Sequence, residues 1–392
     1  MSRYHSHLNT ASEILLQYKG EEPFASFLKK FFSQHKKYGS KDRKQISHLC
    51  YCYFRMGKMA LNTPVPERIL AGLFLCSGSA NEILEELRPG WNEKVTMTAE
   101  EKCTFLGDLC LLSHVFPWRD ELSDGIEYEG FCESFFTQPD VFIRLRSGHE
   151  NWVREKLVKA GLPFKDISQN SIAMASGTKI DNVLALDYEA MIQDLNSQKT
   201  GELMNEAVAR IPVPFISAWD CCAGSGGKSM MLFDIHQQLD LTVSDVRETI
   251  IRNLKKRFAE HGIKNYQTVI ADISKGAPPF RAASKFNLII ADVPCTGSGT
   301  WSRTPEQLYY FDHEAIAQYS YHQKKIVSNI IPHLNPGGYL LYITCSVFKK
   351  ENEENIAFIQ QQYQLELVRM ELLKGYDKKA DTMFAALLQK PL

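Results

Sequence analysis

A glycine-rich stretch, Asp220-Cys-Cys-Ala-Gly-Ser-Gly-Gly-Lys-Ser229, joins an apolar run at 215–220 to a segment with helical periodicity up to Gln238. It matches only part of the phosphate-binding pattern G-x-x-x-x-G-K-[ST], because Cys222 takes the place of the first glycine. It also matches only part of the dinucleotide-binding pattern G-x-G-x-x-G, because Ser229 takes the place of the third glycine. In a strand–turn–helix unit, glycines let the backbone approach a ligand, and the helix N–H groups favour a carboxylate or phosphate. The alternative is a turn that uses glycine only for tightness.

Aspartates end several of the apolar runs around and after this loop. Beyond residue 200, apolar runs alternate with helical segments, which is typical of a doubly wound α/β sheet. We expect its strands at residues 215–220, 241–245, 266–272, 286–292 and 339–345, of which the first four end in Asp. Because ligands bind beyond the carboxyl ends of parallel strands, these carboxylates would meet at one crevice.

Two of these aspartates suit a nucleoside cofactor. Asp245 follows the glycine loop by about twenty residues, where a carboxylate can accept both ribose hydroxyls of an adenosine. Asp272, on the next strand, would reach the adenine. Each Asp alone could instead be a helix N-cap, the commoner role at such junctions. The set of aspartates with the loop favours a nucleoside cofactor, and S-adenosylmethionine carries a carboxylate of the kind that the loop would bind.

Two cysteines follow the last two predicted strands. Cys295 lies in Asp292-Val-Pro-Cys-Thr-Gly-Ser-Gly-Thr300 and Cys345 in Tyr342-Ile-Thr-Cys-Ser346, so both thiols would lie at the rim of the same crevice. A lone cysteine in a sheet is usually a small buried hydrophobe. Two at strand ends beside a cofactor loop are better explained as a nucleophile and a helper group.

Together these motifs resemble the RsmB/Nop-type RNA cytosine-5 methyltransferases, and the resemblance covers most of the chain. The glycine loop looks like the family's first motif, residues 292–300 like its Asp-x-Pro-Cys motif, and Thr344-Cys345-Ser346 with Glu351-Asn352-Glu353 like its Thr-Cys-Ser motif. Further similar stretches are residues 192–198, Arg303 with Pro305, and residues 336–338. The chain departs from the family at Gly224-Ser225, which replaces the usual Ala-Pro and loosens the turn.

The resemblance implies methyl transfer from S-adenosylmethionine to carbon 5 of cytosine in RNA. Cys345 would add to carbon 6, Asp292 would stabilise the charge that develops at ring nitrogen 3, and Cys295 would help release the product. The implied cofactor contacts are Cys222, Ala223, Gly224, Ser225, Gly226, Gly227, Lys228, Asp245, Asp272 and Asp292, and Arg303 is an implied RNA contact. Ribosomal RNA is the substrate that the resemblance favours, although transfer RNA would need the same catalytic residues.

Three other functions compete with this hypothesis. A DNA cytosine methyltransferase would attack with a Pro-Cys cysteine such as Cys295, but it would not need the Thr-Cys-Ser motif. A P-loop hydrolase would need a glycine at Cys222. A non-catalytic RNA-binding ribosome assembly factor that retains the fold would bind RNA without transferring methyl groups.

The overall charge gives no general attraction to nucleic acid, because 45 Lys and Arg nearly balance 46 Asp and Glu. Residues 29–58 nevertheless contain nine Lys or Arg and one acid, Asp42, interleaved with aromatic residues. This basic segment could hold a polyanion. It could equally be part of a helical domain whose aromatic residues form the core and whose lysines are solvated.

The ten cysteines show no C-x-x-C pair and no regular metal-ligand spacing, so we expect free thiols and no metal. Free thiols fit a reducing cytoplasm. The polar start has no signal-peptide pattern and no run is long enough to span a membrane, so we expect a cytoplasmic monomer with no membrane contact.

Three domains are predicted along the chain. Residues 1–137 show helical periodicity and resemble a NusB-like domain. Residues 138–195 form a small α+β, RRM-like module whose first strand, 141–145, alternates as a half-buried strand does, so Arg144 and Arg146 would face RNA or simply solvent. Residues 196–392 would be the Rossmann-like methyltransferase domain.

Overall fold

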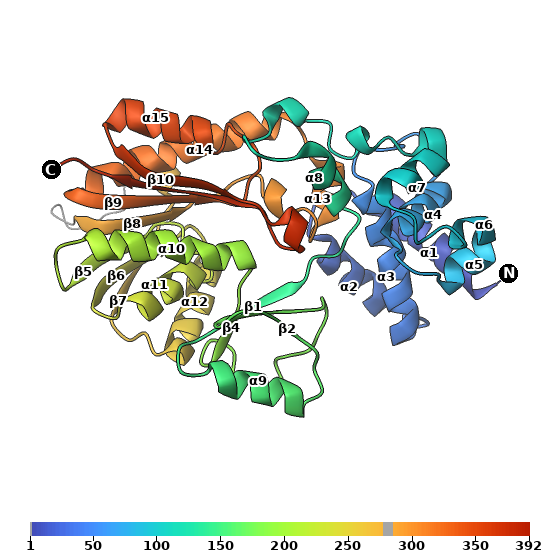
Figure 1. Cartoon of the computed structure of the whole chain (residues 1–392), viewed down its shortest axis with the longest axis horizontal. Helices are drawn as coiled ribbons and strands as arrows, with labels where there is room; N and C mark the ends of the chain where they lie inside the picture. The colour runs from blue at the N-terminus through green and yellow to red at the C-terminus, as the bar shows by residue number, and fades with distance from the viewer. Residues whose placement is uncertain (1, 277–284) are drawn as a thin grey trace. The chain divides into compact units, whose positions relative to one another are not determined.

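The computed structural model describes residues 2–276 and 285–392, which group into two units (Figure 1). Unit 1 comprises Met1–Asp120, Glu127–Gln138 and Thr300–His313, and unit 2 comprises Glu121–Ile126, Pro139–Gly299 and Glu314–Leu392. The segment 300–313 therefore joins unit 1 although it follows a strand of unit 2. The two boundaries between the three domains expected from the sequence remain a prediction.

Unit 1 is helical. Its helices are α1 (Arg3–Gln17), α2 (Phe24–Gln34), α3 (Ser40–Arg55), α4 (Val65–Cys76), α5 (Glu82–Leu87), α6 (Pro89–Asn92), α7 (Ala99–Leu106), α8 (Tyr128–Ser134) and α13 (Pro305–Tyr310). The three-to-four-residue spacing of apolar side chains on α3 buries Ile46, Leu49 and Phe54. The helical N-terminal region is thus confirmed.

The basic segment 29–58 divides into two parts in this unit. Its lysines between residues 29 and 44 are exposed, whereas Phe31 and Phe32 are buried in the core. Arg55, 3% exposed, donates hydrogen bonds to the backbone oxygens of Phe135 and Thr137, and Lys58 donates to those of Tyr309 and Phe311. The end of the segment therefore holds unit 1 together.

The expectation that all ten cysteines are free is wrong at one pair. Cys103 and Cys110 form a disulfide, while the other eight cysteines are free. Helix α7 ends at Leu106, and Gly107 turns the chain with a φ of 57°, which brings Cys110 back beside the last turn of the helix. Sequence spacing alone does not reveal this turn.

Unit 2 contains two sheets. The smaller, antiparallel sheet has the order β2-β3-β1-β4, from β1 (Val141–Leu145), β2 (Lys165–Ser168), β3 (Ser171–Met174) and β4 (Ala190–Ile192), with helix α9 (Glu150–Lys159). The larger sheet has the order β10-β11-β9-β8-β5-β6-β7. Its strands are β5 (Ile216–Asp220), β6 (Leu239–Asp245), β7 (Tyr266–Ile270), β8 (Phe286–Asp292), β9 (Leu334–Thr344), β10 (Glu366–Leu373) and β11 (Met383–Gln389).

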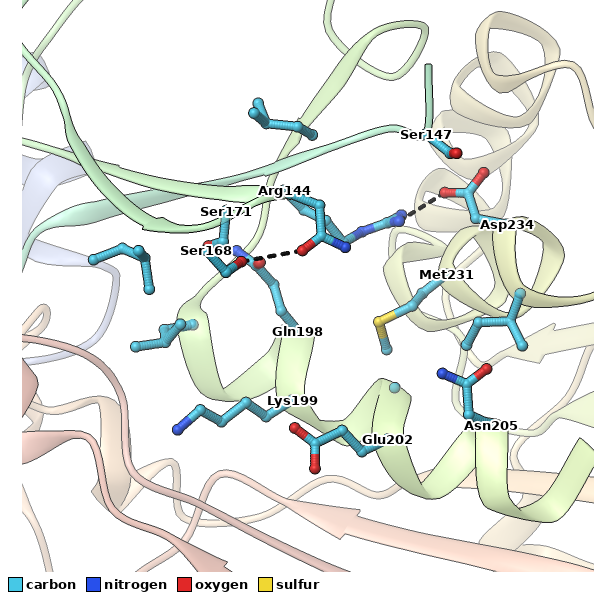
Figure 2. A pocket seen from close by; sticks show the side chains of 16 residues that line it. Arg144, Ser147, Ser168, Ser171, Gln198, Lys199, Glu202, Asn205, Met231 and Asp234 are labelled. Atoms are coloured by element: carbon cyan, nitrogen blue, oxygen red, sulfur yellow. Dashed lines mark hydrogen bonds and ion pairs between the residues drawn. The ribbon is translucent and has the colours of Figure 1, made fainter. Parts of the chain in front are cut away.

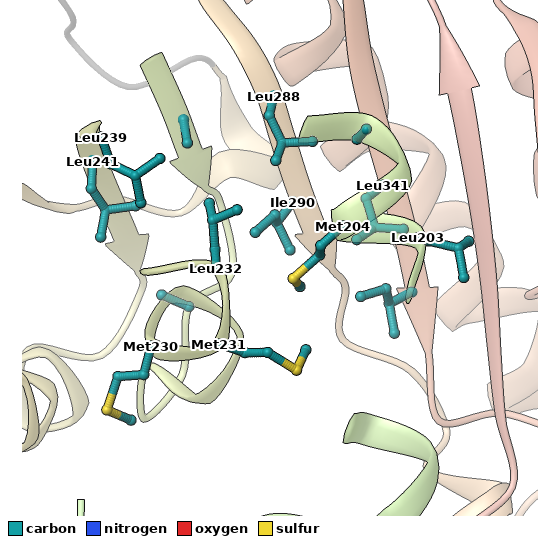
Figure 3. Close-up of a cluster of buried hydrophobic side chains, with 14 of the residues drawn as sticks. Leu203, Met204, Met230, Met231, Leu232, Leu239, Leu241, Leu288, Ile290 and Leu341 are labelled. Carbon is teal, nitrogen blue, oxygen red and sulfur yellow. The ribbon is translucent and has the colours of Figure 1, made fainter. Parts of the chain in front are cut away.

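Helices cover both faces of the larger sheet. One face packs against α10 (Leu195–Arg210), α11 (Gly227–Ile235) and α12 (Glu248–His261); the other packs against α14 (Glu314–Ile330) and α15 (Glu353–Tyr363). Figure 3 shows the first core, where Met204 and Leu232 meet Ile290 and Leu341. Ile289, the residue before Ile290 in β8, points to the opposite face of the sheet and packs in the core formed with α14 and α15. The predicted doubly wound α/β fold is confirmed.

Two features of unit 2 differ from the expectation. Strands β10 and β11, which the apolar pattern did not predict, extend the parallel sheet as an antiparallel pair. Strand β1 is buried on both faces, because Ile143 packs toward α9 while Phe142 packs against Leu195 of α10. The alternating pattern is therefore not that of a half-buried strand here.

Two other kinds of site are absent from the residues that the structure describes. None of their helices is long and apolar enough to cross a membrane. Nor do these residues include a cluster of three His, Cys, Asp or Glu side chains arranged to hold a metal ion.

Candidate active site

The glycine loop connects β5 to α11 through a turn that only glycine fits. Gly226 has a φ of +85°, and a Cβ there would lie 2.6 Å from Cε1 of Phe258 on α12. At Gly224 and Gly227, in contrast, a Cβ would meet no atom within 4 Å. These two glycines line a cavity of about 350 Å³. The loop is therefore pressed against α12 on one side and leaves open space on the other.

Asp245, at the end of β6, holds this loop in place. Its Oδ2 accepts a hydrogen bond from the backbone N of Gly224 at 3.1 Å, and its Oδ1 accepts one from the backbone N of Arg247 at 2.9 Å. The side chain is only 8% exposed. Its carboxylate thus ties the ends of β5 and β6 together beside the cavity.

Several predicted cofactor residues line the 350 Å³ cavity. They are Cys222, Ala223, Gly224, Ser225, Gly227, Lys228 and Asp292. Lys228 Nζ donates to Asp292 Oδ2 at 3.0 Å and to Ser197 Oγ at 2.8 Å, which orients the Asp292 carboxylate at the cavity wall. The predicted contacts Gly226, Asp245 and Asp272 are not part of the lining.

Two further segments that line the cavity were not assigned by the sequence analysis. Residues 191–194 lead into α10, and Asp381 with Met383 begin β11. Part of the first segment was visible as the family-like stretch 192–198. The second carries no local signal, because β11 reaches this edge only by pairing with β9.

The two cysteines come together at the same edge of the sheet. Strands β8 and β9 are parallel neighbours, with Asp292 opposite Ile343, so the loops that follow them are adjacent. The Sγ atoms of Cys295 and Cys345 are 3.2 Å apart, and Cys345 lines the cavity. The pKa of the Cys295 thiol is raised well above its usual range, mainly by the hydrogen bond with the Cys345 sulfur and secondly by burial.

The other strand-end aspartates have structural partners. Asp272 is the N-cap of a 3₁₀ turn, where Oδ1 accepts from Ser274 N and Oγ, and the Ser274 side-chain hydrogen bond is the main cause of its lowered pKa. Asp220 is fully buried, accepts from Ser229 Oγ at 2.6 Å, and has its pKa raised to about 7 by burial. Of the four strand-end aspartates, only Asp292 lines the cavity among the residues described here.

The Arg144 side chain is buried against α11. It borders a separate cavity of about 450 Å³, in which Figure 2 shows its guanidinium directed at Asp234 of α11. Arg144 is 8% exposed, and its Nη1 lies 2.7 Å from Asp234 Oδ2 while Nε donates to Gln193 Oε1 at 2.9 Å. Arg146 pairs with the same carboxylate at 3.1 Å. Both guanidinium groups therefore pair with a carboxylate of α11, so the alternative of a freely solvated strand face is wrong, and the RNA contact of this pair remains a prediction.

Arg303 lies in unit 1, where its backbone N donates to the oxygen of Thr300 at 2.8 Å. Arg303 therefore belongs to the helical unit and not to the unit that contains the 350 Å³ cavity. Its predicted RNA contact remains a prediction.

Comparison with known proteins identifies the part of the chain that forms the larger sheet and most of the cavity lining. Residues 213–388 match the family model described as 16S rRNA methyltransferase RsmB/F. These residues belong to the RsmB/F methyltransferase family. They include the glycine loop, both cysteines and all seven strands of the larger sheet.

Curated relatives of the RsmB/F family match a longer part of the chain. Ribosomal RNA small subunit methyltransferase B of Proteus mirabilis is 29% identical over 241 residues, which cover 59% of this chain and 54% of that protein. The protein of the same name from Citrobacter koseri is 31% identical over 291 residues, covering 72% of this chain and 64% of that protein. The chain thus spans between about half and two thirds of the length of these two relatives.

Two solved structures share the fold of this chain. The crystal structure of PH0851 covers 100% of both chains at a TM-score of 0.71 and 18% identity. The structure of NSun6 from Pyrococcus horikoshii with SFG covers 67% of this chain and 94% of that one, at a TM-score of 0.57 and 16% identity. At these identities the likeness concerns the fold alone.

The cofactor of the RsmB/F family is S-adenosylmethionine, and the 350 Å³ cavity fits it chemically. The open space beside Gly224 and Gly227 lets a ligand approach the backbone, and α11 begins at Gly227, where helix N–H groups favour a carboxylate. Lys228 adds a positive charge to the lining. When bound, the cofactor supplies an electrophilic methyl group.

Proposed function

We propose that this protein transfers a methyl group from S-adenosylmethionine to carbon 5 of a cytosine in RNA, through a covalent bond between Cys345 and the base. The observation that carries the proposal is the 3.2 Å contact between the Cys295 and Cys345 sulfurs at the edge that holds the glycine loop. Two thiols in contact, beside a carboxylate at a cofactor-sized cavity, suit a reaction in which one thiol attacks and another manages a proton.

The nucleophile in this proposal is Cys345. Carbon 5 of cytosine is too weakly nucleophilic to take a methyl group directly, so a thiolate must first add to carbon 6. The addition moves an electron pair toward ring nitrogen 3, and carbon 5 then attacks the methyl group. Cys345 suits this role because it lines the cavity, whereas Cys295 is not among the residues that line it.

Asp292, protonated or sharing a proton with ring nitrogen 3, is proposed to hold the pyrimidine at that atom and to stabilise the charge that develops there. The lysine at its side, Lys228, fixes the carboxylate at 3.0 Å. Because a base in a duplex cannot reach such a cavity, the target cytosine must be single-stranded or flipped out.

Cys295 is proposed to act in release. After methyl transfer, the proton on carbon 5 must leave and the bond between Cys345 and carbon 6 must break, which restores the aromatic ring. The raised pKa of the Cys295 thiol keeps it protonated near neutral pH, so it acts as a relay: it gives its proton to the departing Cys345 sulfur and takes up the proton that leaves carbon 5.

Ribosomal RNA is the proposed substrate, because the curated relatives are named as ribosomal RNA methyltransferases. The same proposal includes contacts with S-adenosylmethionine by the glycine loop, by Asp245 and by Asp272. It also includes the expected cytoplasmic location. Transfer RNA would suit the same chemistry.

Incubation of the protein with labelled S-adenosylmethionine and ribosomal RNA tests the activity. We expect label at carbon 5 of cytosine; binding of RNA without transfer would instead support a non-catalytic assembly factor. Cys345→Ala is expected to give neither product nor covalent adduct. Cys295→Ala is expected to accumulate a protein–RNA adduct on denaturing gels, and the opposite pattern would assign the attack to Cys295.

A further inference from the structure

A buried carboxylate, Glu351, lies beneath the two cysteine loops. The side chain has no solvent exposure, and burial raises its pKa. An ionised carboxylate in such a place is costly unless hydrogen bonds compensate it. Four donors do so: Thr296 N at 3.0 Å, Thr296 Oγ1 at 2.6 Å, Ser346 Oγ at 2.5 Å and Gln323 Nε2 at 2.9 Å.

The first two of these bonds hold the loop of Cys295. Thr296 follows Cys295 directly, and both its backbone N and its hydroxyl point at Glu351. On the other side of Cys295, the backbone oxygen of Pro294 accepts from Gln323 Nε2 at 2.9 Å, and the same amide also reaches Glu351. Both peptide groups that flank Cys295 are therefore tied to the Glu351–Gln323 pair.

The third bond holds the loop of Cys345. Ser346 follows Cys345 directly and donates its hydroxyl to the Glu351 Oε1 that also accepts from Thr296. Asn352, the residue after Glu351, also holds this loop. Its side chain donates to the backbone oxygen of Ser346 and accepts from Thr344 Oγ1. One carboxylate oxygen thus joins the residues that follow the two cysteines.

We propose that Glu351 is a positioning residue that sets the distance between the Cys295 and Cys345 sulfurs. It does not touch the substrate, because it is absent from the lining of the 350 Å³ cavity. Its effect on catalysis rests on the proposed function, while its effect on the sulfur separation does not. Loss of the shared carboxylate oxygen leaves each cysteine loop held by separate contacts, so the two thiols drift apart.

The distance is tested first by a readout that needs no enzymatic activity. Diamide takes two electrons and two protons from a pair of adjacent thiols and leaves a disulfide, which peptide mapping identifies as the Cys295–Cys345 link. In the wild-type protein this link should form rapidly. Glu351→Gln should slow it about tenfold, because the amide NH2 group replaces one of the two acceptor oxygens and leaves two of the four donors without an acceptor, and proximity sets the rate. Glu354→Gln, which removes an exposed carboxylate three residues away, should match the wild type.

Catalysis provides the second readout. Glu351→Gln should lower kcat for methyl transfer by about 10- to 100-fold, as expected for a misplacement of reacting groups on the ångström scale. Its Kd for S-adenosylmethionine should stay within about twofold of the wild type, because neither the glycine loop nor Asp245 contacts Glu351. An unchanged disulfide rate would overturn the proposal whatever the value of kcat, and so would a parallel loss of cofactor affinity and kcat.

A pair of changes at Thr296 keeps the test decisive if Glu351→Gln does not fold. Thr296→Val removes one donor to Glu351 without changing the shape of the side chain, and it should slow disulfide formation; Thr296→Ser keeps the hydroxyl and should restore it. Equal rates in the two variants would refute the positioning role. If the wild type transfers no methyl group, the proposed function fails, but the disulfide rates still decide the role of Glu351.

Discussion

Removal of the Asp245 carboxylate should weaken binding of S-adenosylmethionine by loosening the glycine loop. Asp245 accepts from Gly224 N at 3.1 Å and from Arg247 N at 2.9 Å, and it is nearly buried. A hydrogen bond to a charged group contributes about 1.5 to 3 kcal/mol. If the Gly224 bond alone orders the loop for the cofactor, Asp245→Ala should raise Kd by about 10- to 150-fold.

Isothermal titration calorimetry with the purified protein measures this change. Asp245→Asn should have a smaller effect, because the amide oxygen still accepts from one of the two backbone N–H groups. Asp240→Ala is the matched control, since Asp240 lies on the same strand, β6, and is exposed. An unchanged Kd in a folded Asp245→Ala protein, or an equal rise for Asp240→Ala, would refute the reasoning.

Three further predictions concern charge. Burial raises the pKa of Asp220 to about 7, so the folded state binds one more proton than the unfolded state between about pH 4 and pH 7. The free energy of unfolding of the wild type should therefore fall by about 3 kcal/mol between pH 5 and pH 8. Urea titrations of Asp220→Asn should lack that fall. Arg144→Ala should lower the free energy of unfolding by about 3 kcal/mol, because it breaks a buried pair with Asp234, and a loss of RNA affinity at unchanged stability would show that Arg144 contacts RNA after all. Replacement of the exposed lysines of residues 29–44 by alanine should weaken RNA binding and flatten its dependence on salt, whereas binding curves that do not change would identify these lysines as solvated surface.

The parts of the fold that the sequence predicted are those governed by local pattern. A buried parallel strand reads as a continuous apolar run, so β5 and β8 were recognisable within a residue or two. The turn at Gly226 was recognisable because a positive φ favours glycine. Adjacent strand ends then predicted that Cys295 and Cys345 would share one edge, where the structure has their sulfurs 3.2 Å apart.

Residue type alone did not decide what each strand-end aspartate does. The N-cap alternative applies to Asp272, whose carboxylate accepts from the backbone N of Ser274. Asp220 turns into the interior and meets Ser229, whereas Asp292 meets Lys228 at the cavity. An Asp at a strand end has the same local pattern in each case, but the partner is a nearby turn residue for Asp272 and a residue of α11 for Asp220 and Asp292.

The remaining features depend on residues far apart in the chain. Arg144 was expected to face RNA or solvent because its strand alternates, but Asp234, ninety positions later, gives it a buried partner. Glu351 joins loops fifty-five and five residues away, which no spacing rule anticipates. The sequence by itself determined the strand–loop–helix units and the chemistry that they carry, because these follow from short-range pattern and backbone geometry. Only the tertiary structure decided which charges are buried, which strands close the sheet and what holds the two thiols together, because those outcomes depend on long-range pairing.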